Sequence, residues 1–171
     1  MPHQIRPMQH GDLDAVMAVQ AACYPAPMQE ARAVLEARLH AAAATCIVGC
    51  DDAGLCAYLF AYPSRLGAVT DLGAQFAPAA QPDTLYLHDL SVATRALGRG
   101  LARALVERSL ANGRAAGWRH AALVSVQDSA RFWAGLGFRP ATPAGAGLAS
   151  YPVGALYMAR PLHSPILEST P

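Results

Sequence analysis

The chain has 171 residues, of which 53% are hydrophobic and 15% are charged, and its formal net charge is +1. These values fit one globular domain with a sizeable core and exclude an intrinsically disordered chain. The sequence has no basic or acidic block that would indicate nucleic acid or a membrane surface as a partner. It also lacks a signal peptide and any apolar run near the roughly 20 residues of a membrane span, so we expect a cytoplasmic protein.

Four cysteines, Cys23, Cys46, Cys50 and Cys56, lie in the first third of the sequence. The spacing of Cys46 and Cys50 suits half of a metal site, but the second pair of ligands that such a site uses is missing. Because the sequence has no export signal, we expect the cysteines to be ordinary reduced thiols, and we expect no bound metal.

The first half of the sequence predicts a strand, two helices and a hairpin. Asp12 is a favourable N-cap for the first helix, and Pro25 disfavours helix at the residue before it. Apolar periodicity predicts the second helix, and residues 51–54 have the composition of a turn between two strands. The expected elements are a strand at 3–8, helices at 12–23 and 28–43, strands at 46–50 and 55–62, and an irregular segment at 63–83.

The second half of the sequence predicts a strand, a helix and a strand in succession, then a short helix and a last strand. Such a strand–helix–strand unit almost always has parallel strands and a right-handed crossover. Gly117 is a fitting terminator of the long helix, whose apolar pattern Gly113 interrupts. The expected elements are strands at 84–92, 121–126 and 153–160, helices at 100–116 and 129–136, and a flexible tail at 163–171. We expect a single domain at residues 1–162.

A turn with two glycines joins the strand at 84–92 to the helix that follows it. The first amides of a helix have no backbone partner, and the helix macrodipole gives them partial positive charge. Gly98 and Gly100 remove side chains that would keep phosphate oxygens away from these amides, and Arg95 and Arg99 add positive charge. The turn therefore predicts a phosphate-binding site.

The spacing within this turn distinguishes families of nucleotide-binding proteins. A P-loop needs a Gly-Lys-Ser/Thr ending, which is missing, and a dinucleotide-binding turn needs a third glycine or alanine where this chain has Arg103. The segment 95–100 instead satisfies the pattern Arg/Gln-x-x-Gly-x-Gly/Ala, which is the signature of the GNAT acetyltransferases. A short helix followed by Gly137 and Phe138 matches the next marker of this family. The chain resembles the family up to about Pro161.

The resemblance implies an α/β fold, with a mixed, strongly twisted sheet of six or seven strands and about four helices on its two faces. It implies that the strands at 84–92 and 121–126 splay apart around the pantetheine of acetyl-CoA (CoA), while the turn amides hold the pyrophosphate. Many relatives form dimers, so a homodimer is compatible with the resemblance. The implied cofactor-binding residues are Leu90, Ser91, Val92, Arg95, Leu97, Gly98, Arg99, Gly100, Leu101, Ala102, Ser129, Phe132 and Trp133.

The resemblance also implies direct attack of an amine on the thioester, a reaction that needs a neutral amine and favours a general base. His88 and Asp89 are the candidate catalytic residues beside the thioester position. Strand alternation predicts that only one of them points into the cleft. Either side chain could instead fix a neighbouring loop by hydrogen bonds. The expected acceptor is a primary amine of a small molecule or peptide, with Tyr24, Tyr86 and His88 at its binding site.

Trp133 departs from the family, because many members have a tyrosine at this place that protonates the departing thiolate. An indole N–H is a poor acid and cannot take this role, although the CoA thiolate is a good leaving group. Tyr151, which we include among the candidate catalytic residues, is a substitute, and Tyr24 and Tyr157 are others. Each of these tyrosines could instead be a core or interface aromatic.

Two other functions are alternatives to an N-acetyltransferase. The first is a protein of the same fold that binds CoA or acyl-CoA without catalysing transfer, and Trp133 favours it. The second is another kind of nucleotide-binding enzyme, which the missing lysine and the missing third glycine of the turn disfavour. The sequence specifies neither the acceptor amine nor the acyl chain.

Overall fold

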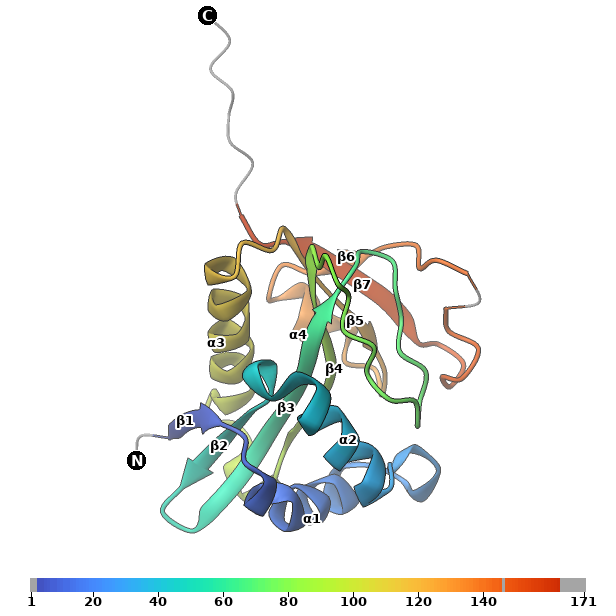
Figure 1. Cartoon of the computed structure of the whole chain (residues 1–171). Helices are drawn as coiled ribbons and strands as arrows, with labels where there is room; N and C mark the ends of the chain where they lie inside the picture. Colours follow the sequence, from blue (N-terminus) through green and yellow to red (C-terminus); the bar gives the residue numbers. More distant parts are fainter. Residues whose placement is uncertain (1–2, 146, 164–171) are drawn as a thin grey trace, which may run out of the picture.

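In the part of the chain that the structure describes, seven strands form one sheet in the order β1-β2-β3-β4-β5-β7-β6 (Figure 1). The computed structural model describes residues 3–145 and 147–163. The strands are β1 (Gln4–Pro7), β2 (Ile47–Asp51), β3 (Gly54–Ser64), β4 (Thr84–Val92), β5 (His120–Ser125), β6 (Arg139–Pro140) and β7 (Leu156–Pro161). The α-helices are α1 (Leu13–Cys23), α2 (Arg32–Ala42), α3 (Leu101–Ala115) and α4 (Ala130–Ala134). This architecture confirms the predicted mixed α/β fold.

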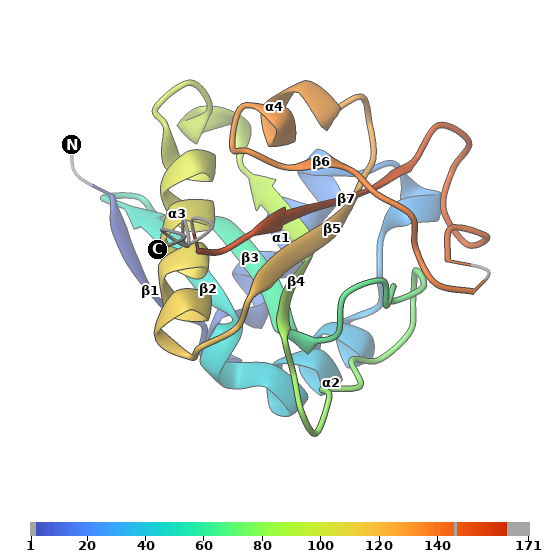
Figure 2. The same ribbon diagram turned by 90° about the horizontal axis from the view of Figure 1, so that it is seen from above.

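The centre of the sheet contains the predicted strand–helix–strand unit. β4 and β5 are parallel, whereas the other neighbouring strands pair antiparallel. α3 connects β4 with β5 and covers one face of the twisted sheet, while α1 and α2 pack on the other (Figure 2). Gly113 lets α3 approach the sheet closely, since a Cβ there would lie 3.0 Å from Leu162 Cδ1 and 3.5 Å from Leu85. The interruption of the apolar pattern thus marks a close helix–sheet contact.

The first helix starts where the sequence predicts but without the expected side-chain cap, and the second helix starts later than predicted. Asp12 occupies the N-cap position of α1, but its carboxylate instead accepts hydrogen bonds from Arg6 (2.7 and 2.8 Å) and from the Gln9 amide (2.8 Å). α2 begins at Arg32 rather than near residue 28. The reason is that a single 3-10 turn at Ala26–Met28 returns to extended backbone before the helix starts.

The C-terminal part also differs in detail. β7 begins at Leu156 instead of residue 153, and the two-residue strand β6 is too short to leave a periodic signal in the sequence. Apart from His163, the predicted tail at 163–171 lies outside the described residues. The four cysteines carry free thiols. In the described part of the chain, no helix is long and apolar enough to cross a membrane, and no group of three metal-ligating side chains could hold an ion.

Candidate active site

A cleft of about 250 Å³ opens where β4 and β5 diverge. The two strands pair from Thr84 with His120 to Leu87 with Leu123, and the pairing ends there. The residues that line the cleft are Tyr24, Leu87, His88, Asp89, Leu90, Val92, Leu97, Ala102, Val124, Val126, Gln127, Ser129, Phe132 and Trp133. The walls are thus largely apolar, with a few polar residues among them.

The glycine turn lies at one end of this cleft, because Leu97 and Ala102 on either side of it line the wall. Gly98 and Gly100 have φ values of +73° and +76°, a left-handed conformation that side chains disfavour. A Cβ at either residue would meet nothing within 4 Å, so the space beside the turn is open. An open glycine turn directly before the first amides of a helix is the arrangement that binds phosphate groups in many proteins.

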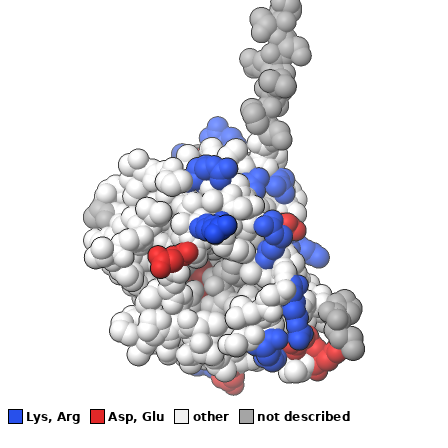
Figure 3. Space-filling model, turned by 180° about the vertical axis from the view of Figure 1, so that it is seen from behind, with Lys and Arg blue, Asp and Glu red and all other residues white. Residues whose placement is uncertain are grey.

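One of the two arginines of the turn, Arg95, forms hydrogen bonds within the protein. Arg95 does not extend freely from the turn: its Nη2 donates to Asp51 Oδ1 (3.2 Å) and to the carbonyl oxygen of Leu55 (3.1 Å). This side chain therefore braces the turn against the β2–β3 hairpin. Figure 3 shows that basic side chains gather beside a hollow on the back of the molecule. A surface of this charge attracts a phosphate-bearing ligand.

A bulge in β4 places two polar side chains on the same side of the sheet. Phe60 pairs with Asp89 and Ala61 pairs with Leu87, so His88 has no partner in β3. Both His88 and Asp89 line the cleft and face α1 and the α1–α2 connection. The strand alternation on which the prediction for this pair rested does not hold here, because the extra residue of the bulge brings both side chains to one side of the sheet.

Asp89 is a buried carboxylate held by two tyrosines. Its Oδ1 accepts from the Tyr24 hydroxyl (2.8 Å) and its Oδ2 accepts from the Tyr58 hydroxyl (2.9 Å), while Ser91 Oγ lies 3.5 Å away. Burial raises the pKa of Asp89 above its ordinary value, although His88 and the two tyrosines act in the opposite direction. Tyr58 gave no signal in the sequence, since it sits within an apolar strand.

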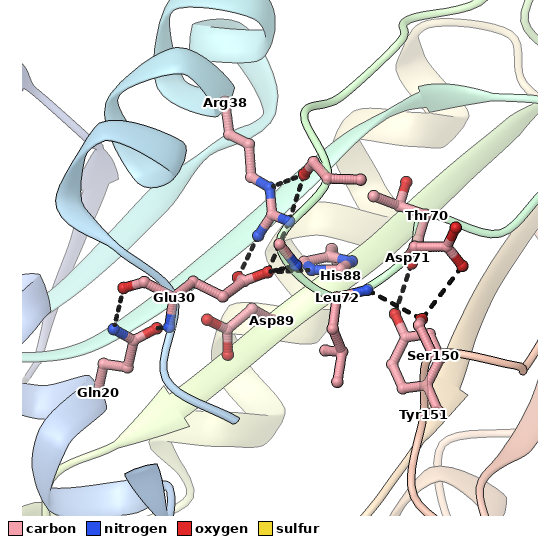
Figure 4. A network of polar contacts seen from close by, with 12 residues as sticks. Gln20, Glu30, Arg38, Thr70, Asp71, Leu72, His88, Asp89, Ser150 and Tyr151 are labelled. Atoms are coloured by element: carbon pink, nitrogen blue, oxygen red, sulfur yellow. Dashed lines mark hydrogen bonds and ion pairs between the residues drawn. The ribbon is translucent and has the colours of Figure 1, made fainter. Parts of the chain in front are cut away.

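His88 contacts a second buried carboxylate, that of Glu30, which Figure 4 shows between His88 and Arg38. Its Nε2 lies 3.6 Å from Glu30 Oε1, and Arg38 Nη2 donates to the same oxygen at 2.7 Å. Burial by itself raises the pKa of Glu30, but the hydrogen bonds and charges of His88 and Arg38 outweigh it and hold this pKa at about 2. The sequence analysis missed both Glu30 and Arg38. Arg38 had a detectable signal, because it falls on the apolar face of α2 with Leu35 and Leu39.

The acetyltransferase (GNAT) family model matches residues 13–138, which include the glycine turn and the whole cleft. The chain belongs to the GNAT acetyltransferase family. As a family member it is an N-acyltransferase that takes its acyl group from acyl-CoA. A search of curated proteins by sequence gives no match.

Several solved structures share this GNAT fold. GphF, a GNAT-like decarboxylase in complex with isobutyryl-CoA, has a TM-score of 0.78 and 21% identity, over 94% of this chain and 100% of that chain. The loading GNATL domain of CurA from Lyngbya majuscula has a TM-score of 0.76 and 10% identity, over 95% and 98%. The ribosomal-protein-S18-alanine N-acetyltransferase from Escherichia coli has a TM-score of 0.65 and 17% identity, over 95% and 96%. At these identities the likeness concerns the fold alone.

Trp133 forms part of the cleft wall of this GNAT protein, at the place where many members have tyrosine. Its Nε1 donates to Ser129 Oγ (3.1 Å), which also contacts Ser125 Oγ (3.0 Å). The indole meets Phe132 and Phe138 edge to face, at centroid distances of 5.0 and 5.6 Å. The side chain is therefore fixed on the wall and offers the cleft no acidic hydroxyl.

The tyrosines considered as substitutes lie in different places. Tyr24 lines the cleft, but its hydroxyl donates to Asp89. The Tyr151 hydroxyl donates to the carbonyl oxygen of Thr70 (2.6 Å), and the Tyr157 hydroxyl accepts from the Gly67 amide (2.8 Å). Tyr151, in the loop before β7, and Tyr157, in β7 itself, therefore both hold the irregular segment after β3 in place.

Of the other predicted site residues, some line the cleft and some do not. Tyr86 is fully buried beside His88, with a ring-centroid distance of 6.1 Å, and does not line the cleft. Ser91 turns toward Asp89 instead of the cleft. The predicted cofactor residues that do line the cleft are Leu90, Val92, Leu97, Ala102, Ser129, Phe132 and Trp133.

Proposed function

We propose that this protein transfers an acetyl group from acetyl-CoA to a primary amine of a small molecule or peptide by direct attack. One observation carries the proposal: the cleft between β4 and β5 joins the glycine turn to His88 and Asp89. The turn suits the diphosphate of the donor, and the polar pair suits transfer of the amine proton. A single cleft can therefore bind the donor and activate the acceptor.

The divergence of β4 and β5 supports a role for backbone amides in polarising the donor. Acetyl-CoA supplies an acyl group that is activated as a thioester. Beyond Leu87 the β5 side of β4 has no strand partner, so backbone amides among Leu90, Ser91 and Val92 are free to donate to a carbonyl in the cleft. Such a donor contributes about 3 kcal/mol when it is aimed at the oxygen that becomes negative.

His88 accepts the proton of the attacking amine in this proposal. The amine nitrogen forms a bond with the acyl carbon, the carbon–sulfur bond breaks, and the amine proton passes to the imidazole. CoA leaves as a thiolate and takes a proton from water, because Trp133 offers none. The carboxylates of Glu30 and Asp89 stabilise the positive charge that His88 gains.

Two alternative functions have less support than amine acetylation. The likeness to GphF makes decarboxylation of a carboxyacyl-CoA a second candidate, but Glu30 and Asp89 beside the cleft disfavour a negatively charged acyl group. A CoA-binding protein without transfer is not favoured, because it needs neither the bulge nor the two polar side chains that the bulge brings to the cleft.

Calorimetric titration with acetyl-CoA and CoA tests donor binding, and an amine panel with detection of the released thiol tests transfer. We expect binding of both nucleotides and thiol release that requires an amine. Incubation with malonyl-CoA in the absence of amine serves as the comparison. Carbon dioxide release there, without transfer to any amine, would replace the proposed function by decarboxylation.

Substitution of the polar pair tests the catalytic assignment. We expect His88→Ala to lower kcat by about 10²- to 10⁴-fold, the usual effect of losing a general base, while acetyl-CoA affinity stays within twofold. Asp89→Asn should lower kcat to a smaller degree. His40→Ala, a change of an exposed histidine in α2, is the control. Full turnover by folded His88→Ala would remove His88 from the mechanism.

A further inference from the structure

Glu30 is fixed in place although it lies outside any helix or strand. Its amide donates to Gln20 Oε1 (3.1 Å), and Gln20 Nε2 donates to its carbonyl oxygen (2.9 Å). The residue is only 8% exposed. A connection between two helices ordinarily lies at the surface and is mobile. The two hydrogen bonds with Gln20 therefore indicate that Glu30 has to be held at this position for a function.

The carboxylate of Glu30 is held as firmly as its backbone. Arg38 meets both of its oxygens, and the Gly73 amide donates to Oε1 at 2.7 Å. Arg38 is itself held by the carbonyl oxygen of Ala74 (Nε–O 2.9 Å) and by the ring of Phe76, 5.0 Å away. These contacts fix the carboxylate, and Oε1 faces His88.

The two ring nitrogens of His88 have different surroundings. Nε2 faces Glu30 at 3.6 Å, whereas Nδ1 is buried and has no hydrogen-bond partner among residues 3–145 and 147–163. Phe76 and Tyr86 flank the ring at centroid distances of 5.5 and 6.1 Å. A buried nitrogen without a partner is costly, and His88 lines the cleft, so Nδ1 is the ring nitrogen left to accept a hydrogen bond from a molecule bound beside it.

We propose that Glu30 is a positioning residue that holds the proton of neutral His88 on Nε2, so that the Nδ1 lone pair receives the proton of the acceptor amine. The inference rests on the proposed function for the role of His88, while the position of the ring proton can be measured without any substrate. A carboxylate beside one imidazole nitrogen fixes the tautomer in this way and stabilises the imidazolium that forms.

In this arrangement the positive charge that forms on His88 during proton transfer faces the negative charge of Glu30. When the amine proton moves to Nδ1 and the amine nitrogen bonds to the acyl carbon, His88 becomes an imidazolium whose Nε2–H faces the Glu30 carboxylate. The charged groups that face it are Glu30 from the α1–α2 connection and Asp89 from β4, with Arg38 behind Glu30. Glu30 remains ionised throughout the step and acts only through His88.

The first test is ¹⁵N NMR of the wild-type chain, at a pH where the His88 ring is neutral. Its signals are assigned by their loss in His88→Gln. We expect a protonated Nε2 and an unprotonated Nδ1. A proton on Nδ1 would overturn the inference, whether or not the protein acetylates any amine. Conversely, an Nε2–H ring in a protein that transfers no acetyl group would overturn the proposed function alone.

The second test is Glu30→Gln, which keeps the side-chain shape and an oxygen for Arg38 and Gly73 but removes the charge. We expect mixed tautomers of His88 and a fall in kcat of about tenfold or more, with an unchanged KM for acetyl-CoA. Glu36→Gln is the matched control, since Glu36 contacts His10 at 3.1 Å on the surface. A folded Glu30→Gln with the wild-type tautomer and kcat contradicts the inference. If this variant does not fold, the wild-type spectrum still decides.

Discussion

Replacement of both Gly98 and Gly100 with glutamate is expected to weaken acetyl-CoA binding by about 100-fold or more. Both residues have positive φ and open space beside them, so the new carboxylates would occupy the cradle in front of the α3 amides. There they would repel the diphosphate and block its approach. A hundredfold loss corresponds to about 2.7 kcal/mol of binding free energy. Isothermal titration calorimetry with acetyl-CoA measures it directly.

Gly117→Glu is the matched control for this double variant. Gly117 follows the other end of α3, has φ of +80° and also has open space beside it, so the substitution brings backbone strain comparable to that at either glycine of the turn, without touching the cradle. We expect the control to lose some thermal stability but to bind acetyl-CoA like the wild type. Equal binding by the double variant would show that the diphosphate is held elsewhere.

Much of the fold was predictable because its signals are local. Alternation and apolar periodicity located the β2–β3 hairpin, β4, α3 and β5 to within a few residues. The glycines at 98 and 100 identified the turn, since a tight strand-to-helix connection with open amides needs residues that accept positive φ. The order of these elements then determined the parallel pairing of β4 and β5.

The polar part of the site was less predictable because it depends on contacts between distant segments. The bulge at His88 arises from the pairing of β4 with β3 and leaves no mark in the β4 sequence alone. Glu30 stood in a segment predicted to be helical, where a charged residue is usually solvated. Only the structure shows that Arg38, 0% exposed in its side chain, meets Glu30 and that Glu30 lies beside His88. Sequence reasoning therefore named His88, the base that we propose, but neither Glu30 nor Arg38.

Arg38→Leu is expected to cause a larger loss of stability than any surface substitution. The guanidinium is buried between Glu30 and Phe76, so its removal leaves the Glu30 carboxylate with only His88 and the Gly73 amide for compensation. Breaking a buried ion pair by removing one partner typically costs about 3–5 kcal/mol. Arg32→Leu is the control: it makes the same change in the same helix, where Arg32 is 43% exposed beside Asp14 and contributes at most about 1 kcal/mol.

The pH dependence of unfolding separates lost charge pairing from lost packing in Arg38→Leu. The pKa of Glu30 falls from its ordinary value of 4.5 to about 2 in the folded protein. A carboxyl whose folded pKa is depressed stabilises the protein above its unfolded pKa, and this contribution is lost as the pH falls toward the folded pKa. Urea unfolding of the wild type should therefore show stability declining from about pH 4.5 to 2. In Arg38→Leu this decline should be smaller. A decline as steep as that of the wild type would mean that His88, rather than Arg38, keeps the Glu30 carboxyl ionised.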